Sequence, residues 1–165
     1  MVARNLQELF IHELKDLYDA NLKTEKFHKL LRDEAKNAEL KSTLEDAVSG
    51  IKRGIEAIEG ICRDHGEKPE GATCKGMRGL IDEAEAHVFE ESYADPDVKD
   101  AVIIAQAQRM GHYALAGYGT AAAFAHALAH DKSETTLREH LDHIYSGDRR
   151  LTRLAENTVN KSALS

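Results

Sequence analysis

Residues 98–130 read VKDAVIIAQAQRMGHYALAGYGTAAAFAHALAH, and this stretch decides the fold. Apolar or small side chains recur along it at the spacing of one face of a long helix, with His112 in the same series: Val98, Val102, Ala105, Leu115, Gly119 and Ala122. Between Met110 and His130 there is no Asp, Glu, Lys or Arg, and most side chains are Ala or Gly. A helix that is apolar nearly all round is usually buried, so we expect it to be the central helix of a bundle.

The residues just before this helix carry a start signal. Asp95 and Asp97 offer capping carboxylates, and Pro96 suits the first helical turn. The length of the stretch permits a membrane span, which needs about 20 residues. However, the stretch is rich in Ala and Gly and contains three histidines, so we expect no membrane span.

The composition predicts an all-α protein. The 165 residues suit one domain, residues 1–165, with a sizeable core. Strand-forming residues are sparse, there is no Trp, and only two prolines interrupt a chain rich in Ala, Leu, Glu and Lys. The net charge of -7 argues against sequence-independent binding of nucleic acid, which depends on Lys and Arg to neutralise phosphates.

The two cysteines, Cys62 and Cys74, fit no zinc signature and no disulfide framework. The first residues, MVARNLQELF, lack the apolar core of a secretory signal. We therefore expect a cytoplasmic protein with reduced thiols, although a single bridge between the two cysteines stays open.

Helical periodicity extends over most of the chain. Short loops make neighbouring helices antiparallel, so the first two should form a hairpin. Gly66 suits the left-handed position after the second helix, and Ser133 suits the cap of the last one. The predicted helices are residues 6–36, 38–64, 75–92, 98–130 and 133–160.

Polar residues interrupt or flank the apolar stripes. Asn21 lies on the first stripe, either as a hydrogen-bonded core residue or facing an interior polar site. Ser49 and Lys52 flank the second stripe, and Lys52 either extends its ammonium into water or reaches the interior. Asp148 lies on the last stripe, where a lone buried carboxylate needs a partner.

Three segments resemble the YciF-type proteins, a bacterial ferritin-like family tied to stress responses. They are LFIHELKDLYDAN (Leu9–Asn21), GEKPEGATCKGMRGLIDEAE (Gly66–Glu85) and DPDVKDAVIIAQAQRMGHYALAGYGT (Asp95–Thr120). The resemblance implies a ferritin-like four-helix bundle with one short additional helix, a homodimer and, for the family, a di-metal carboxylate site in the core. Such sites take a Glu from each of two helices and Glu-x-x-His pairs from the other two, and these donors suit Fe or Mn.

The sequence departs from the family pattern where metal ligands belong. A Glu of the first helix, a ligand pair of the second, a Glu-His-Tyr-Glu run of the central helix and an acidic run of the last helix are all altered. By the resemblance, the former ligand positions are Asn21, Ser49, Lys52, Gly111 and Ile144. The polar candidates that remain are His112, His143 and Asp148.

Loss of anionic ligands removes the reason for a divalent cation to leave water. We therefore hypothesise that Lys52 replaces the positive charge of the metal and pairs with Asp148, alongside His112 and Asn21. Such a buried pair is favourable only with good geometry and satisfied hydrogen bonds.

Three functions follow as expectations. The first is a stress-associated, metal-free protein with a structural or binding role, without cofactor or catalytic residues. The second is an iron or manganese metalloprotein or oxidase with a site rebuilt from His112, His143 and Asp148. The third is a binder of small molecules in the space where the metals belong. The sequence does not identify a protein or small-molecule partner.

Overall fold

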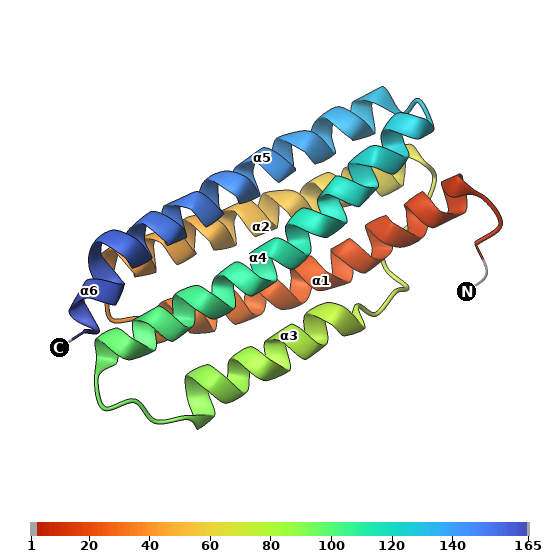
Figure 1. Ribbon diagram of the computed structural model, residues 1–165. Coiled ribbons are helices and arrows are strands. Elements are labelled where there is room, and N and C mark those ends of the chain that lie inside the picture. Colours follow the sequence, from red (N-terminus) through yellow and green to blue (C-terminus); the bar gives the residue numbers. More distant parts are fainter. Residues whose placement is uncertain (1–2, 165) are drawn as a thin grey trace.

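The computed structural model describes residues 3–164, and within that range every regular element is helical (Figure 1). The elements are α1 (Leu6–Glu34), α2 (Ala38–Asp64), α3 (Lys75–Glu85), a π-helical turn η1 (Ala86–Glu90), α4 (Pro96–Ala127), α5 (Asp131–Leu154), a second π-helical turn η2 (Ala155–Val159) and α6 (Asn160–Ser162).

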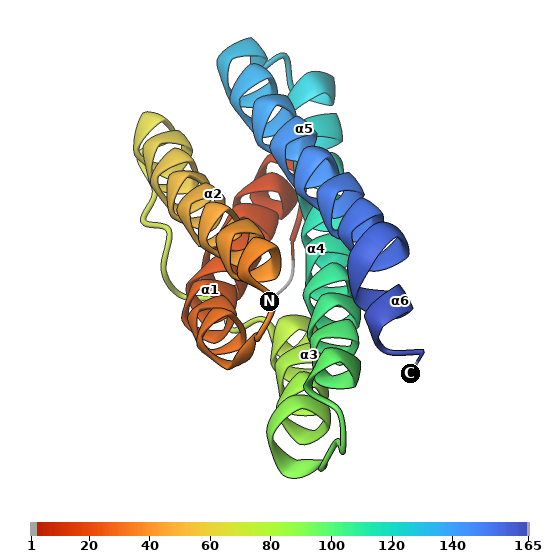
Figure 2. The ribbon, with the colours of Figure 1, turned by 90° about the vertical axis from the view of Figure 1, so that its left-hand side faces the viewer.

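Four long helices, α1, α2, α4 and α5, form a bundle in which each helix is antiparallel to its two neighbours (Figure 2). α1 and α2 form one hairpin, and α4 and α5 form the other. α3 lies outside the bundle against α1 and α4, and it carries the chain back along the bundle between the two hairpins. The predicted all-α bundle with one short additional helix is confirmed.

Helix ends mostly follow their capping residues. The Asn37 side chain accepts the backbone N–H groups of residues 39 and 40, and Asp95 caps α4 with Pro96 in its first turn. The prediction for α2 is confirmed at both ends, and Gly66 takes the left-handed conformation, with a φ of 71°. The predicted cap at Ser133 is wrong. Because Ala129 turns the chain with a φ of 55°, α5 begins at Asp131 and Ser133 lies buried inside its first turn.

The expectation that α4 is buried all round is also wrong. Its buried face includes Ile103, Met110 and Tyr118, whereas Ala105 and His112 are exposed. The physical reason is that α1, α3 and α5 cover only part of the helix surface. A helix of mostly Ala and Gly has little amphipathic contrast, so its sequence did not reveal which face turns outward.

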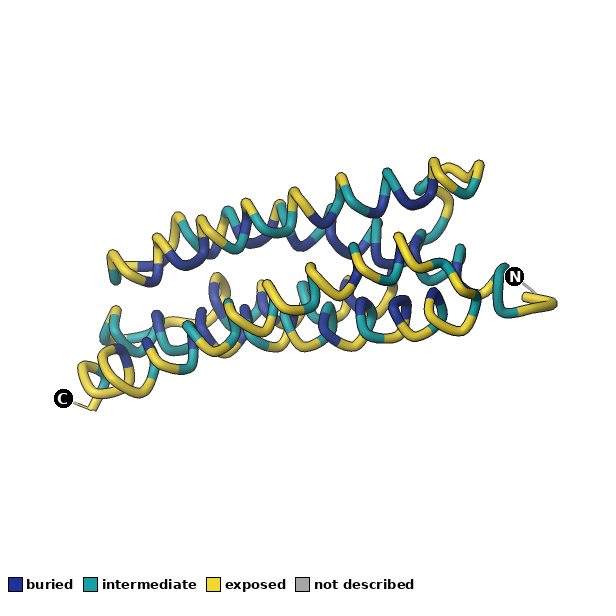
Figure 3. Tube along the Cα trace, turned by 90° about the horizontal axis from the view of Figure 1, so that it is seen from above, coloured by how far each residue is buried: buried dark blue, intermediate teal, exposed yellow. Residues whose placement is uncertain are grey.

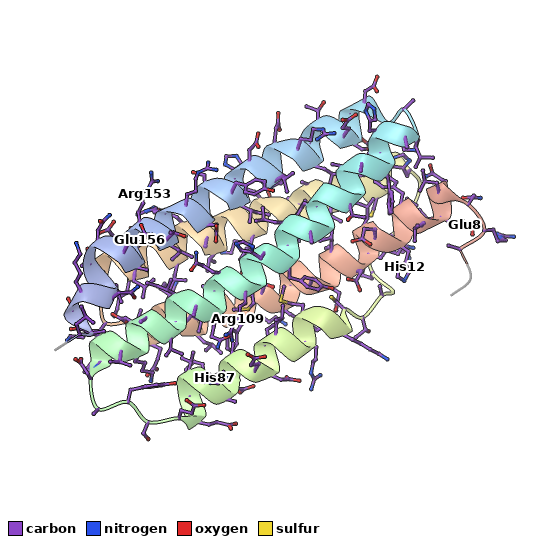
Figure 4. All side chains as sticks on the ribbon, in the orientation of Figure 1. Glu8, His12, His87, Arg109, Arg153 and Glu156 are labelled. Carbon is purple, nitrogen blue, oxygen red and sulfur yellow. The ribbon has the colours of Figure 1, made fainter. Side chains whose placement is uncertain are left out.

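Buried residues line the inward sides of the long helices (Figure 3). Asp100 is buried among them, and its two carboxylate oxygens accept the backbone N–H groups of Lys36 and Asn37 at 2.8 and 2.7 Å. This carboxylate therefore joins α4 to the turn between α1 and α2. On the outer side, Arg109 points toward α3, where its guanidinium pairs with Glu83 at 2.6 Å (Figure 4).

Both cysteines are buried free thiols, in agreement with the expected reduced state. Cys74 caps α3, and burial raises the pKa of the Cys62 thiol to about 11. Among residues 3–164, no helix is long and apolar enough to cross a membrane.

Candidate functional site

A cavity of about 280 Å³ lies inside the bundle, lined by residues of α1, α2, α4 and α5. It lies where the family resemblance places the metal site, since Asn21, Gly111, Ile144 and Asp148 all line it. The residues that line this cavity therefore define the candidate site.

The innermost polar contact joins α1 to α4. The Asn21 amide donates a hydrogen bond to the Tyr118 hydroxyl at 2.6 Å, and both side chains are buried. Burial raises the pKa of Tyr118 well above its usual range, so the phenol is neutral. Gly54 on α2 leaves the space for this hydroxyl, because a Cβ there would collide with it and lie 3.5 Å from the Asn21 amide nitrogen. The Asn21 position is thus a neutral, hydrogen-bonded core residue that lines the cavity.

His28 forms a second polar group at the cavity wall on α1. Its Nδ1 lies 3.1 Å from the carbonyl oxygen of Thr24, and because a carbonyl only accepts, Nδ1 carries the proton. Burial lowers the pKa of His28 to about 4, so the ring is neutral and Nε2 holds a lone pair. His28 lines the cavity, and no hydrogen bond from another residue between 3 and 164 reaches its Nε2. Nε2 is therefore available as an acceptor.

Aromatic rings on α4 and α5 lead from the core toward solvent. The Tyr118 and His140 rings stack, with centroids 5.9 Å apart and 29° between their planes. His143, which is exposed, follows at 6.3 Å from the His140 centroid. Burial, then His143 and Arg53, lower the pKa of His140. These three side chains form a wall that runs from a buried phenol to an exposed imidazole.

The predicted register on α2 is wrong. Ser49 and Lys52 are exposed and line no part of the cavity, and the Lys52 ammonium lies 3.9 Å from Glu25 on α1. The residues of α2 that line it include Gly50 and Arg53, one position further along. One residue turns a helix by about 100°, which is enough to move a side chain from the wall of the bundle to its outer face.

The hypothesis that Lys52 pairs with Asp148 is wrong for the same reason. Asp148 Oδ1 instead accepts from Gln108 Nε2 at 3.0 Å and lies 3.1 Å from His112 Nε2, both on α4. His112 is 63% exposed at its side chain. The Asp148 carboxylate thus finds its polar partners on α4, at the edge of the cavity, and this contact joins α4 to α5.

The di-metal group that the resemblance implies does not fit these residues. The inner positions carry an amide, a phenol, glycines and an isoleucine, which offer no anionic oxygen. Within residues 3–164, no three His, Cys, Asp or Glu side chains gather closely enough to hold a metal ion. His112, His143 and Asp148 belong to the same part of the bundle, but Asp148 pairs with His112 whereas His143 contacts His140.

The sequence alone did not single out Arg53 or Tyr118. The signal for Arg53 was its distance of three residues from Gly50, which is the same spacing as that of the expected ligand pair, Ser49 and Lys52. Tyr118 had a weaker signal, since it is one of the two tyrosines within the Ala-rich half of α4.

Comparison with known proteins agrees with this fold. Residues 5–164 match the family described as a domain of unknown function, DUF892. The chain is 33% identical to Protein YciF of Escherichia coli K12 over 164 residues, which is 99% of this chain and 98% of that protein.

Two solved structures share the architecture. The crystal structure of the E. coli stress protein YciF has a TM-score of 0.89 and 32% identity, and the match covers 96% of this chain and 99% of that one. The protein YcfI from Rhodopseudomonas palustris has a TM-score of 0.86 and 31% identity, over 92% of this chain and 98% of that one.

Proposed function

The chain belongs to the DUF892 family, which it shares with the stress protein YciF, and we propose that it is a stress-associated, metal-free member whose core cavity serves a binding role. The observation that carries the proposal is the contact at the cavity floor, where Asn21 and Tyr118 satisfy each other beside Gly54. In a di-metal bundle, carboxylates take up this central space. Here neutral groups occupy it and need no cation.

The charges around the cavity support the same conclusion. A divalent cation leaves water only for ligands that offer comparable negative charge, because burial of an uncompensated ion is costly. The lining instead includes the Arg53 guanidinium, which repels a cation, and an Asp148 carboxylate already bound by Gln108 and His112. The family architecture persists while the chemistry of its centre has changed.

The metal content of the untagged protein tests the proposal. The protein is expressed with added iron and manganese, and metal is measured by mass spectrometry together with the protein concentration. We expect well below one equivalent of Fe or Mn per chain. One or two equivalents that survive chelation and fall in the Asp148→Ala variant would instead favour the metalloprotein or oxidase with a rebuilt ligand set.

We also propose a cytoplasmic homodimer, which the family resemblance supports. Light scattering after size-exclusion chromatography tests it, because each chain contributes 18.3 kDa. A species of twice that mass at micromolar concentration is the expected result, and a single-chain mass would contradict it.

A further inference from the structure

The cavity contains one charge that the proposed function leaves without a role. Arg53 lines it from α2, and no hydrogen bond or ion pair joins its guanidinium to any residue between 3 and 164. The other charged groups of the lining have partners. Arg150 on α5 pairs with Asp46 on α2, and Asp148 is held by Gln108 and His112.

Two histidines face the same part of the cavity. His140 and His143 come from α5, and His140 senses the positive charge of Arg53, which helps to lower its pKa. The groups that face His140 are therefore Arg53 from α2, Tyr118 from α4, and His143 and Glu139 from its own helix. Glu139 is exposed and lies outside the lining, so the charged group that the lining places next to these two histidines is Arg53.

The interior is suited to a flat apolar group. Ile51, Met110, Ala114, Ile144 and Leu151 line it, next to the stacked rings of Tyr118 and His140. Aromatic rings favour offset stacking at centroid distances of about 4.5–7 Å, and Tyr118 and His140 present such faces. A volume of about 280 Å³ lies at the small end of ligand pockets, which measure about 300–1,000 Å³.

The His28 imidazole adds one directional requirement. His28 lines the cavity and its neutral Nε2 has no partner among residues 3–164, so a ligand with a hydroxyl group could donate a hydrogen bond to it. A ligand that meets these requirements has an anionic group at the mouth of the cavity, a ring in its middle and a hydroxyl donor near His28. These three features together describe one chemical class.

We propose that the cavity binds a small aromatic carboxylate, preferably hydroxylated, with its carboxylate on Arg53 and its ring beside Tyr118 and His140. Arginine recognises carboxylates through two parallel N–H donors, which makes it the natural anchor at this position. The inference rests on the proposed binding role, because a metal centre would take up the same space.

Isothermal titration of the purified full-length protein tests the class of ligand. The probes are 4-hydroxybenzoate, the neutral benzyl alcohol and inorganic phosphate, each at pH 7. We expect 4-hydroxybenzoate to bind at least tenfold more tightly than the other two. The Arg53→Gln variant should weaken its binding at least tenfold. Arg63→Gln is the matched control, since Arg63 is an exposed arginine of the same helix outside the cavity, and it should leave binding unchanged.

Each alternative result has a defined meaning. If benzyl alcohol binds as tightly and Arg53→Gln has no effect, the carboxylate class is overturned while the binding role stands. If phosphate binds as tightly as 4-hydroxybenzoate, the site recognises charge alone and the aromatic part of the proposal is overturned. If no probe binds, this inference is overturned, whereas the metal measurement separately decides whether the bundle is metal-free. Arg53 is exposed, so its substitution does not threaten folding, and circular dichroism checks this point.

Discussion

Protonation of His28 should destabilise the bundle strongly in mild acid. In the folded protein burial lowers the pKa of His28 to about 4, whereas in the unfolded chain an ordinary histidine has a pKa of about 6.5. The unfolded state therefore binds a proton first as the pH falls. The stability that depends on neutral His28 is fully present above pH 6.5 and is lost as the pH approaches 4.

The magnitude follows from the two pKa values. A difference of one pKa unit between the folded and unfolded states corresponds to about 1.4 kcal/mol. Protonation of His28 alone should therefore lower the free energy of unfolding by about 3 kcal/mol between pH 7 and pH 4. Folded domains have about 5–15 kcal/mol of total stability, so this loss is large. Within residues 3–164, the one hydrogen bond of His28 goes to the Thr24 carbonyl, and no ion pair with a carboxylate offsets a charge on its ring.

Urea unfolding followed by circular dichroism measures the effect at pH 7, 6, 5 and 4. The comparison protein is His28→Gln, which keeps a polar side chain but cannot titrate. All other histidines contribute equally to both proteins, so the free energy of unfolding of the natural chain should fall by about 3 kcal/mol more than that of the variant. Nuclear magnetic resonance should also show no titration of the His28 ring above pH 5.

Parallel stability curves for the two proteins would refute the reasoning. A difference below about 1 kcal/mol over this range would mean that the folded pKa of His28 is close to the ordinary value. The cavity would then hydrate the imidazolium, and the neutral acceptor that the ligand proposal uses would be lost below about pH 6.5.

Three further substitutions test the packing around the cavity and the attachment of α4, with urea unfolding as the common measurement. Gly54→Ala should destabilise by about 1–3 kcal/mol, because its Cβ collides with the buried Tyr118 hydroxyl, whereas Gly60→Ala on the same helix meets no atom within 4 Å and should stabilise by up to about 1 kcal/mol. Equal effects at the two glycines would contradict the close approach. Tyr118→Phe should cost about 1–3 kcal/mol, because it leaves the buried Asn21 amide without its acceptor, and a neutral result would show that water replaces the hydroxyl. Asp100→Ala should cost about 3 kcal/mol or more, since two backbone N–H groups lose a buried, charged acceptor, and a loss below about 1 kcal/mol would show that they find other partners.

The helices could be predicted well where the sequence combines an apolar face with clear capping and terminating residues. α2 is an example, since Asn37 caps its start, Gly66 ends it with a left-handed turn, and apolar residues recur between them. α4 has equally clear start signals at Asp95 and Pro96. Its faces could not be assigned because alanine suits both a buried and an exposed surface, so Ala105 and His112 were placed on the wrong side.

The candidate site was predicted in part, and the errors share one physical cause. The positions of Asn21, Gly111, Ile144 and Asp148 at the cavity are as expected. On α2 the sequence pattern favoured Lys52, because glycine has no side chain to mark a core-facing position. Gly54 of α2 lies against Tyr118. Only the structure shows that the Tyr118 hydroxyl needs the space that a side chain at this position would fill.

The substitutions at the centre of the bundle are consistent with one another only when they are taken together. A buried carboxylate without a metal would lack compensation, so a chain that loses the cation gains stability when it also loses the anionic ligands. On the proposal of a metal-free centre, the neutral hydrogen bond between Asn21 and Tyr118 takes the place of that chemistry, and Gly54 supplies the space for it. The same helices then leave a cavity whose unpaired charge is positive, at Arg53. A metal site attracts cations through its anionic wall, whereas the unpaired charge of this wall is positive, which is why we propose that it attracts an anion.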